Sequence, residues 1–370
     1  MGDKRVNQTD RKNALESDVK DEKQSKAVSV DTAANVMQAA RNATAQDVAN
    51  LAGVSRWTVA RAFKRDASIS QKNLEKVLNA AKDLGYAPDL LASSLATNKT
   101  NLVALLIDDF DNPYKLPLLK HLTDALQQKG LAALVINIGE FHSPTDALLN
   151  ASQRRVDAAI LMGTGFSDEL LSTALGAQRM KKMIVFARES SHERTISISC
   201  DNARAIREIV EHALERGFEK TAFLAGPITH STSLLRKRTF VRELKRLGKP
   251  EPDIFSIPTY NRELARDAVH SYLDGLEADH YPDLMLCEND VIALGAIDAI
   301  RYDRGLSVPD DIAVIGFDNI DLCATPAYDL TSYHQPLEEM VHHLLNLLDD
   351  IPPGEDVIRV PGKLVVRTSG

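Results

Sequence analysis

The chain has 370 residues, of which 44% are apolar and 26% are charged, a composition typical of globular proteins and long enough for two or three domains. This composition excludes a fibrous or low-complexity chain. No long apolar run and no apolar leader is present, so we expect neither a membrane span nor a secretory signal. The three cysteines are far apart and lack CxxC spacing, which argues against a disulfide framework or a metal site and favours a reducing, cytoplasmic location.

The net charge of -8 is unevenly distributed along the chain. Residues 41–100 carry nine basic and five acidic side chains, a net charge of +4, whereas the residues after 100 have a net charge of -12. A basic module on an acidic body predicts that only the module faces an anionic partner. Residues 1–40 are polar, electrically balanced and without periodicity, and we interpret them as a disordered tail, with Met37 as an alternative start.

Residues 43–85 have the pattern of three short helices. Thr44 and Asp47 form an N-cap pair resembling a capping box, and Gly53 ends the first helix. Ser55 caps a second helix after a short turn, as in a helix-turn-helix. Ser70 caps a third helix. The predicted apolar faces are Val59, Ala62 and Phe63 on the second helix, and Leu74, Val77, Leu78, Ala81 and Leu84 on the third.

Strand-like apolar runs alternate with amphipathic helical stretches after residue 101. The runs are 102–107, 132–138, 158–162, 183–187, 221–225, 284–287 and 312–316. This alternation predicts an α/β fold with parallel sheets covered by helices on both faces, and about 270 residues favour two similar subdomains. Ligands of open α/β sheets bind beyond the carboxyl ends of the strands. Those ends carry polar residues here, namely Asp108, Asp109, Asn112, Arg188, Glu288, Asn289, Asp290, Asp318 and Asn319.

Residues 43–100 resemble the DNA-binding headpiece of the LacI/GalR family of bacterial transcription regulators. The matching motifs are DVA-x-LAGVS at the turn, TV-x-R in the second helix, LGY-x-P at the junction and A-x-SL in the hinge. The motifs DNPY, ENDVIALGA, VPDDIAVIGFDN and HQP follow in family order. The resemblance implies a helix-turn-helix headpiece (41–87), a hinge helix with linker (88–100), and an effector-binding and dimerisation core (101–370). It also implies that this core resembles periplasmic binding proteins, with two Rossmann-like subdomains.

The second helix of such a headpiece is the recognition helix, whose N-terminal residues meet base edges in the major groove. Arg56 and Arg61 are able to make bidentate contacts to guanine, and Trp57, which departs from the family pattern, is able to contact a thymine methyl group. Lys64 and Lys72 are expected at phosphates. The predicted headpiece contacts are Thr44, Ser55, Arg56, Trp57, Thr58, Arg61 and Lys64.

The hinge helix resembles the family element that enters the minor groove of DNA. Leu95 matches the leucine that wedges into the central base step, and Ala92 matches the alanine at which paired hinge helices pack closely. Ser93 and Ala96 replace basic residues that are common in the family, which removes two potential phosphate contacts.

Arg236 and Asp318 resemble the family's clamp for a small-molecule effector. A guanidinium offers a rigid fork of donors and a carboxylate offers two acceptors, a combination that suits neighbouring hydroxyl groups of a sugar. Ala187 stands where the family often has an acidic residue, so the specificity of a relative does not transfer unchanged. The further predicted effector contacts are Asn289, Tyr260, Asp109, Tyr114, Arg188 and His230.

These features favour a ligand-controlled repressor that binds a near-palindromic operator as a homodimer and responds to a sugar or sugar derivative. No P-loop, HExxH or GxSxG motif is present, and we expect no cofactor, no metal and no enzymatic activity. Two alternatives stay open: a soluble sugar-binding protein, and a sugar-modifying enzyme with an appended DNA-binding domain.

Overall fold

The computed structural model describes residues 43–64, 68–89, 94, 97–110, 112–138, 143–163, 171, 182–227, 231–351 and 354–370, with the backbone alone for 231–234. The predicted residues Ala92, Leu95 and His230, like the predicted tail, lie outside these ranges. The chain divides into two compact units, 1–93 and 94–370. Within the described part, no helix is both long and apolar enough to span a membrane.

The described part of the first unit contains the helices α2 (Ala45–Ala52), α3 (Arg56–Ala62) and α4 (Gln71–Leu84). The cap residues act as the sequence predicts. Thr44 and Asp47 form a capping box on α2, and Ser70 accepts a hydrogen bond from the first turn of α4. Gly53 adopts the left-handed conformation, with φ 64°, and so turns the chain from α2 toward α3.

The core of the first unit is small and made of valine and alanine side chains. Val48, Val59 and Val77, one from each helix, are fully buried together. The prediction that Phe63 lies on the buried face of the second helix is wrong, because the structure exposes it, and Leu78 and Leu84 on the apolar face of α4 are exposed as well. Phe63 lies just beyond the end of α3 and contacts the ring of Tyr86 edge-on, with the ring centroids 5.7 Å apart.

The second unit contains two six-stranded sheets, each forming its own subdomain. The amino-terminal sheet has the order β11-β5-β4-β3-β1-β2 and the carboxyl-terminal sheet the order β12-β10-β9-β8-β6-β7. All neighbouring strands are parallel except β12, which is antiparallel to β10. The strands are β1 (Leu102–Ile107), β2 (Ala132–Asn137), β3 (Ala158–Met162), β4 (Met183–Phe186), β5 (Ile196–Cys200), β6 (Thr221–Ala225), β7 (Asp253–Ser256), β8 (Leu284–Cys287), β9 (Ala313–Asp318), β10 (Thr331–His334), β11 (Val357–Val360) and β12 (Lys363–Val365).

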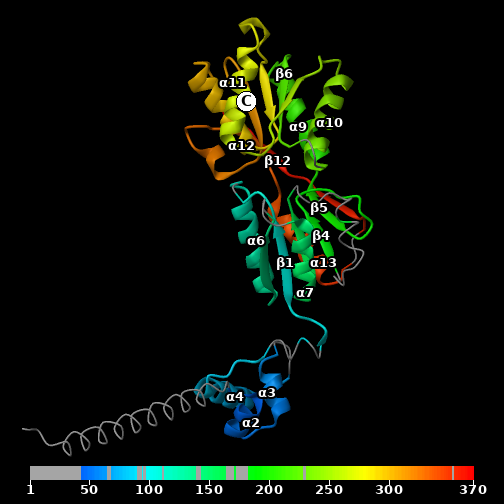
Figure 1. Ribbon diagram of the computed structural model, residues 1–370, viewed down its shortest axis with the longest axis vertical. Coiled ribbons are helices and arrows are strands. Elements are labelled where there is room, and N and C mark those ends of the chain that lie inside the picture. Colours follow the sequence, from blue (N-terminus) through cyan, green and yellow to red (C-terminus); the bar gives the residue numbers. More distant parts are fainter. Residues whose placement is uncertain are drawn as a thin grey trace, which may run out of the picture. The chain divides into compact units, whose positions relative to one another are not determined.

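Helices cover both faces of each sheet, as expected for parallel strands. In the amino-terminal subdomain, α6 (Lys115–Gln128) and α13 (Leu337–Leu348) contact each other on one face, and α7 (Pro144–Gln153) packs on the other. In the carboxyl-terminal subdomain, α9 (Asn202–Glu215) and α10 (Ser231–Arg246) lie opposite α11 (Arg262–Asp274) and α12 (Asp290–Asp298) (Figure 1).

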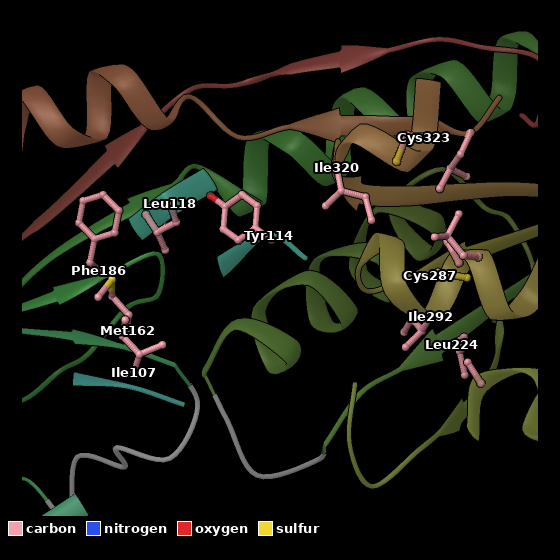
Figure 2. Close-up of a cluster of buried hydrophobic side chains, with 14 of the residues drawn as sticks. Ile107, Tyr114, Leu118, Met162, Phe186, Leu224, Cys287, Ile292, Ile320 and Cys323 are labelled. Carbon is pink, nitrogen blue, oxygen red and sulfur yellow. The ribbon is translucent and has the colours of Figure 1, made fainter. Parts of the chain in front are cut away.

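The chain crosses between the subdomains three times: after β5, after β10 and after β11. One buried apolar cluster accordingly reaches into both subdomains. Figure 2 shows Phe186 and Leu118 at one end of this cluster, and Cys287 and Ile292 at the other. The fold is therefore the predicted one, a helix-turn-helix unit followed by a periplasmic-binding-protein-like core of two α/β subdomains.

Candidate functional site

Helix α3 carries most of the predicted headpiece contacts. Arg56 and Trp57 are exposed, whereas Arg61 and Thr58 are half-buried. The Ser55 hydroxyl accepts a hydrogen bond from the backbone N–H of Thr58 at 3.1 Å and bonds the Thr58 hydroxyl at 2.9 Å. These two hydroxyls thus fix the start of the helix, while the arginine and tryptophan side chains are left to face a partner.

The guanidinium of Arg61 stacks on the ring of Trp57. The distance from Cζ to the ring centroid is 4.2 Å, within the range of a cation–π interaction. Lys64 and Lys72 are both exposed, as a phosphate contact requires. The Thr44 hydroxyl donates to the Asp47 carboxylate at 2.6 Å, so it takes part in the cap of α2.

A cleft of about 550 Å³ lies where strand ends of the two sheets face each other. Seven of the eight predicted effector contacts line it together, and His230 is outside the described residues. The full lining is Asp108, Asp109, Asn112, Tyr114, Lys115, Gly163, Phe186, Ala187, Arg188, Arg236, Tyr260, Asn289, Asp318 and Gln335. The structure thus brings these residues, which strand-end position and the motifs single out, together in one cleft.

The backbone at the cleft turns sharply where strands end. Asp109, Ala187 and Asp318, which follow or end β1, β4 and β9, have positive φ angles of 53°, 64° and 115°. Such angles are unfavourable for residues with a Cβ, and they concentrate at functional sites. Gly163, with φ 134°, follows β3, and a Cβ there would lie 1.7 Å from Asp108 Oδ1. Only glycine lets the Asp108 carboxylate lie against this strand end.

Arg236 is a buried charge held by several partners. Its Nε donates to Asn202 Oδ1 at 2.7 Å, and another guanidinium nitrogen donates to the backbone oxygen of Glu288 at 2.6 Å. The guanidinium also stacks on the ring of Phe317, with Cζ 3.4 Å from the centroid. These contacts fix the plane of the guanidinium and thereby the direction of its remaining donors.

Asp318 lines the same cleft as Arg236 and is also buried. Burial raises the pKa of Asp318 to about 6, although the nearby Arg236 and a 2.6 Å hydrogen bond from Gln335 Nε2 both favour the charged form. Asp290, buried directly behind it, accepts hydrogen bonds from the Ser332 hydroxyl and the Ile320 backbone. Burial and the charge of Asp318 raise the pKa of Asp290 to about 7.

Tyr260 forms one wall of the cleft and is fixed by two neighbours. Its hydroxyl donates to Glu288 Oε1 at 3.0 Å, and the other oxygen of that carboxylate accepts from the Gly226 backbone at 2.6 Å. A Cβ on Gly226 would lie 2.1 Å from Tyr260 Cε1, so the ring lies flat against that glycine. Burial raises the pKa of the Glu288 carboxyl, which is 1% exposed.

Two buried polar atoms at the cleft lack a hydrogen-bond partner among the described residues. They are the hydroxyl of Tyr114 and Oε1 of Gln335. Buried polar groups are normally satisfied by a hydrogen bond, so two such atoms beside one cleft are unusual. Asn289 adds an amide to the lining of the cleft, and its Oδ1 also caps α12.

Three supporting side chains of the cleft could not be assigned from the sequence. In the sequence, Glu288 is recognisable only as a residue at a strand end and Asn202 only as a residue at a helix start. Gln335 is recognisable only as part of the HQP motif. The structure shows that they hold Tyr260, Arg236 and Asp318 respectively.

Lys115 was not singled out at all, although it lines the cleft and its Nζ lies 3.6 Å from Asp108 Oδ1. The cleft thus combines carboxylates, amides, hydroxyls and positively charged side chains around aromatic rings.

Two family models match the chain. The model described as "Bacterial regulatory proteins, lacI family" matches residues 44–89, and the one described as "Periplasmic binding protein-like domain" matches residues 210–370. The first covers the described helices α2 to α4, and the second covers most of the carboxyl-terminal subdomain together with α13 and β11.

Curated relatives match over most of the chain. The HTH-type transcriptional regulator DegA of Bacillus subtilis is 30% identical over 302 residues, which cover 80% of this chain and 88% of the relative. The HTH-type transcriptional repressor PurR of Photobacterium profundum is 27% identical over 333 residues, covering 88% of this chain and 98% of the relative.

A solved structure of the Lac repressor dimer, bound to operator and the anti-inducer ONPF, has the same fold. It superposes with a TM-score of 0.76 at 25% identity and covers 89% of this chain and 99% of that one. Motifs, fold, family models and relatives agree: the chain belongs to the lacI family of bacterial regulatory proteins, whose members are DNA-binding transcriptional regulators.

Proposed function

We propose that this protein is a transcriptional repressor that binds a near-palindromic operator as a homodimer and is controlled by a sugar or sugar derivative held in the cleft between its two sheets. The observation that carries the effector class is the buried pair of Arg236 and Asp318, beside unpartnered polar atoms of Tyr114 and Gln335. A fixed fork of donors and a carboxylate acceptor suit neighbouring hydroxyls, and the flat ring of Tyr260 suits the apolar face of a sugar.

DNA binding is supported by the exposed arginine, tryptophan and lysine side chains of the basic headpiece. We also propose that Ala92 and Leu95 of the hinge contact the minor groove of the operator. From the motifs we propose that residues 41–87 form the headpiece, residues 88–100 the hinge helix with its linker, and residues 101–370 the effector-binding and dimerisation core.

The homodimer is supported by the exposed apolar side chains of the two edge strands β2 and β7. Val135 and Ile254 are each 46% exposed, and Leu116 and Leu264 are exposed on the neighbouring helices α6 and α11. Such an edge is covered most simply by a second copy of the same surface. Light scattering should give twice the chain mass of 40.7 kDa. Val135→Lys together with Ile254→Lys should give the monomer mass, and a dimer that survives both changes would place the interface elsewhere.

The test of function has two arms. Selection from random duplexes should enrich a near-palindrome, and a thermal-shift screen of sugars, sugar phosphates and purines should find a ligand, because a bound ligand stabilises the folded core by mass action. The ligand should then change operator affinity. Stabilisation by purines alone would contradict the sugar class while leaving the repressor role intact, and conversion of the sugar to a product would support an enzyme instead.

A further inference from the structure

The single tryptophan of the chain lies on the surface of the headpiece. Trp57 is 66% exposed on α3, while Val48, Val59 and Val77 already fill the core of this unit. A large exposed aromatic ring is not explained by folding, because exposing it forgoes the free energy of burial. Its role must therefore come from a contact on the surface.

That contact is with Arg61, one helical turn later. Side chains four residues apart on a helix are neighbours, and the guanidinium carbon lies 4.2 Å from the centroid of the ring. Stacking uses the face of the guanidinium, whereas its N–H donors point outward in its plane. The N–H edge of the Arg61 guanidinium, which a bidentate contact to guanine needs, therefore stays accessible while its face packs on the ring of Trp57.

From this geometry we propose that Trp57 is a positioning residue, which holds Arg61 so that the two side chains read one guanine as a unit. A free arginine side chain loses rotamer entropy when it is fixed against a base, and the stack removes part of that loss in advance. An exposed cation–π contact recovers about 0.5–1 kcal/mol, which corresponds to a factor of about 2–5 in affinity for the base that Arg61 reads. This inference rests on the proposed DNA binding and differs from a direct contact of Trp57 with a thymine.

The stack is testable in the free protein, without DNA. Because Trp57 is the only tryptophan, all tryptophan fluorescence of the full chain comes from this ring. Arg61→Ala should uncover one face of the ring and raise the rate of acrylamide quenching. Arg56→Ala is the matched control for fluorescence, since adjacent helix residues do not face each other, and it should leave quenching unchanged. Equal quenching in the unmodified protein and Arg61→Ala would overturn the stacked unit.

The reading role is testable with the operator selected by the unmodified protein. Trp57→Ala should weaken the preference for guanine at one base pair by about 2–5-fold, and Trp57→Phe should retain that preference. In a protein that already carries Arg61→Ala, Trp57→Ala should have no further effect at that base pair. Additive effects, or loss of preference for a thymine at another base pair, would overturn the proposal and make Trp57 an independent reader. If no duplex is enriched, the proposed function fails together with the reading role, while the quenching result still decides whether the stack exists.

Discussion

The candidate contact residues on α3 are nearly consecutive in sequence and exposed or half-buried, whereas those of the cleft come from eight separate segments between Asp108 and Gln335 and are mostly buried. A surface helix needs only its caps and one buried stripe, so its outer residues are free to change with the operator. In the cleft each polar side chain needs a partner, because a buried unsatisfied group is costly. Substitutions should therefore have large effects in the cleft and modest, local effects on α3.

The largest expected effect is that of Arg236→Ala. It removes a buried cation with three fixed contacts, and truncating one member of a buried charge pair costs roughly 2–5 kcal/mol of binding. We expect at least about a thirtyfold loss of effector affinity by calorimetry, with operator binding retained. Arg238→Ala, an exposed charge on the same helix, is the control and should be neutral. A normal effector response in Arg236→Ala would exclude Arg236 from the clamp.

The next effect is expected from Gly226→Ala. The new Cβ would lie 2.1 Å from the ring of Tyr260, so the ring must move and its hydrogen bond to Glu288 must break. Loss of one hydrogen bond and a displaced wall should lower effector affinity about tenfold. Gly275→Ala is the matched control, because a Cβ there meets its neighbours at ordinary distances of 3.5 Å and beyond. Unchanged affinity in Gly226→Ala would remove Tyr260 from the binding wall.

A smaller effect should appear as a pH dependence of the cleft. The pKa of Asp318 is raised to about 6 in the folded chain. Between about pH 4 and pH 6 this carboxyl is therefore protonated in the folded chain but ionised in the unfolded chain. The contribution of Asp318 therefore makes the ligand-free protein less stable as the pH rises through this window. Hydroxyl groups bind the ionised carboxylate best, so effector affinity should rise over the same window.

Asp318→Asn should abolish both trends at that residue, leaving only the contribution of Asp290, whose pKa should fall because the charge of Asp318 no longer raises it. The measurements are denaturant titrations without ligand and binding isotherms with it, from about pH 5 to pH 8. An affinity that is independent of pH in the unmodified protein would mean that Asp318 does not accept hydrogen bonds from the effector.

The smallest effect is expected in the headpiece. Ser55→Ala removes the side-chain acceptor at the start of α3, which typically costs about 1 kcal/mol. Unfolding followed by Trp57 fluorescence should shift to lower denaturant, while the cleft should bind effector unchanged. Ser55→Asn keeps an acceptor and should restore the midpoint. A shift that is the same in both variants would show that the cap does not stabilise the helix.

The two regions also differ in how far the sequence predicts them. The apolar runs 102–107, 158–162, 221–225 and 284–287 coincide with β1, β3, β6 and β8, because fully buried parallel strands are continuously apolar. Strands β5, β7, β10 and β11 were missed because polar residues stand within or at the ends of their apolar runs. The Ser197 and Ser332 side chains are buried with hydrogen-bond partners that only the tertiary fold provides.

The same reason limits prediction of the cleft. Strand-end position and family motifs located Arg236, Asp318 and Asn289, but Glu288 acts through Tyr260, and that pairing is not visible in the sequence. In the headpiece the cap residues were predicted correctly. The error at Phe63 arose because the helix ends one residue earlier than its apolar spacing indicates.

The most direct test of the whole account is fluorescence anisotropy of the selected duplex, titrated with the full chain with and without the ligand found by thermal shift. The account predicts binding roughly a thousandfold or more tighter than to random duplex, a steep decrease with salt, and a change in affinity when ligand is added. Equal affinity for the selected and random duplexes, with or without ligand, would contradict it.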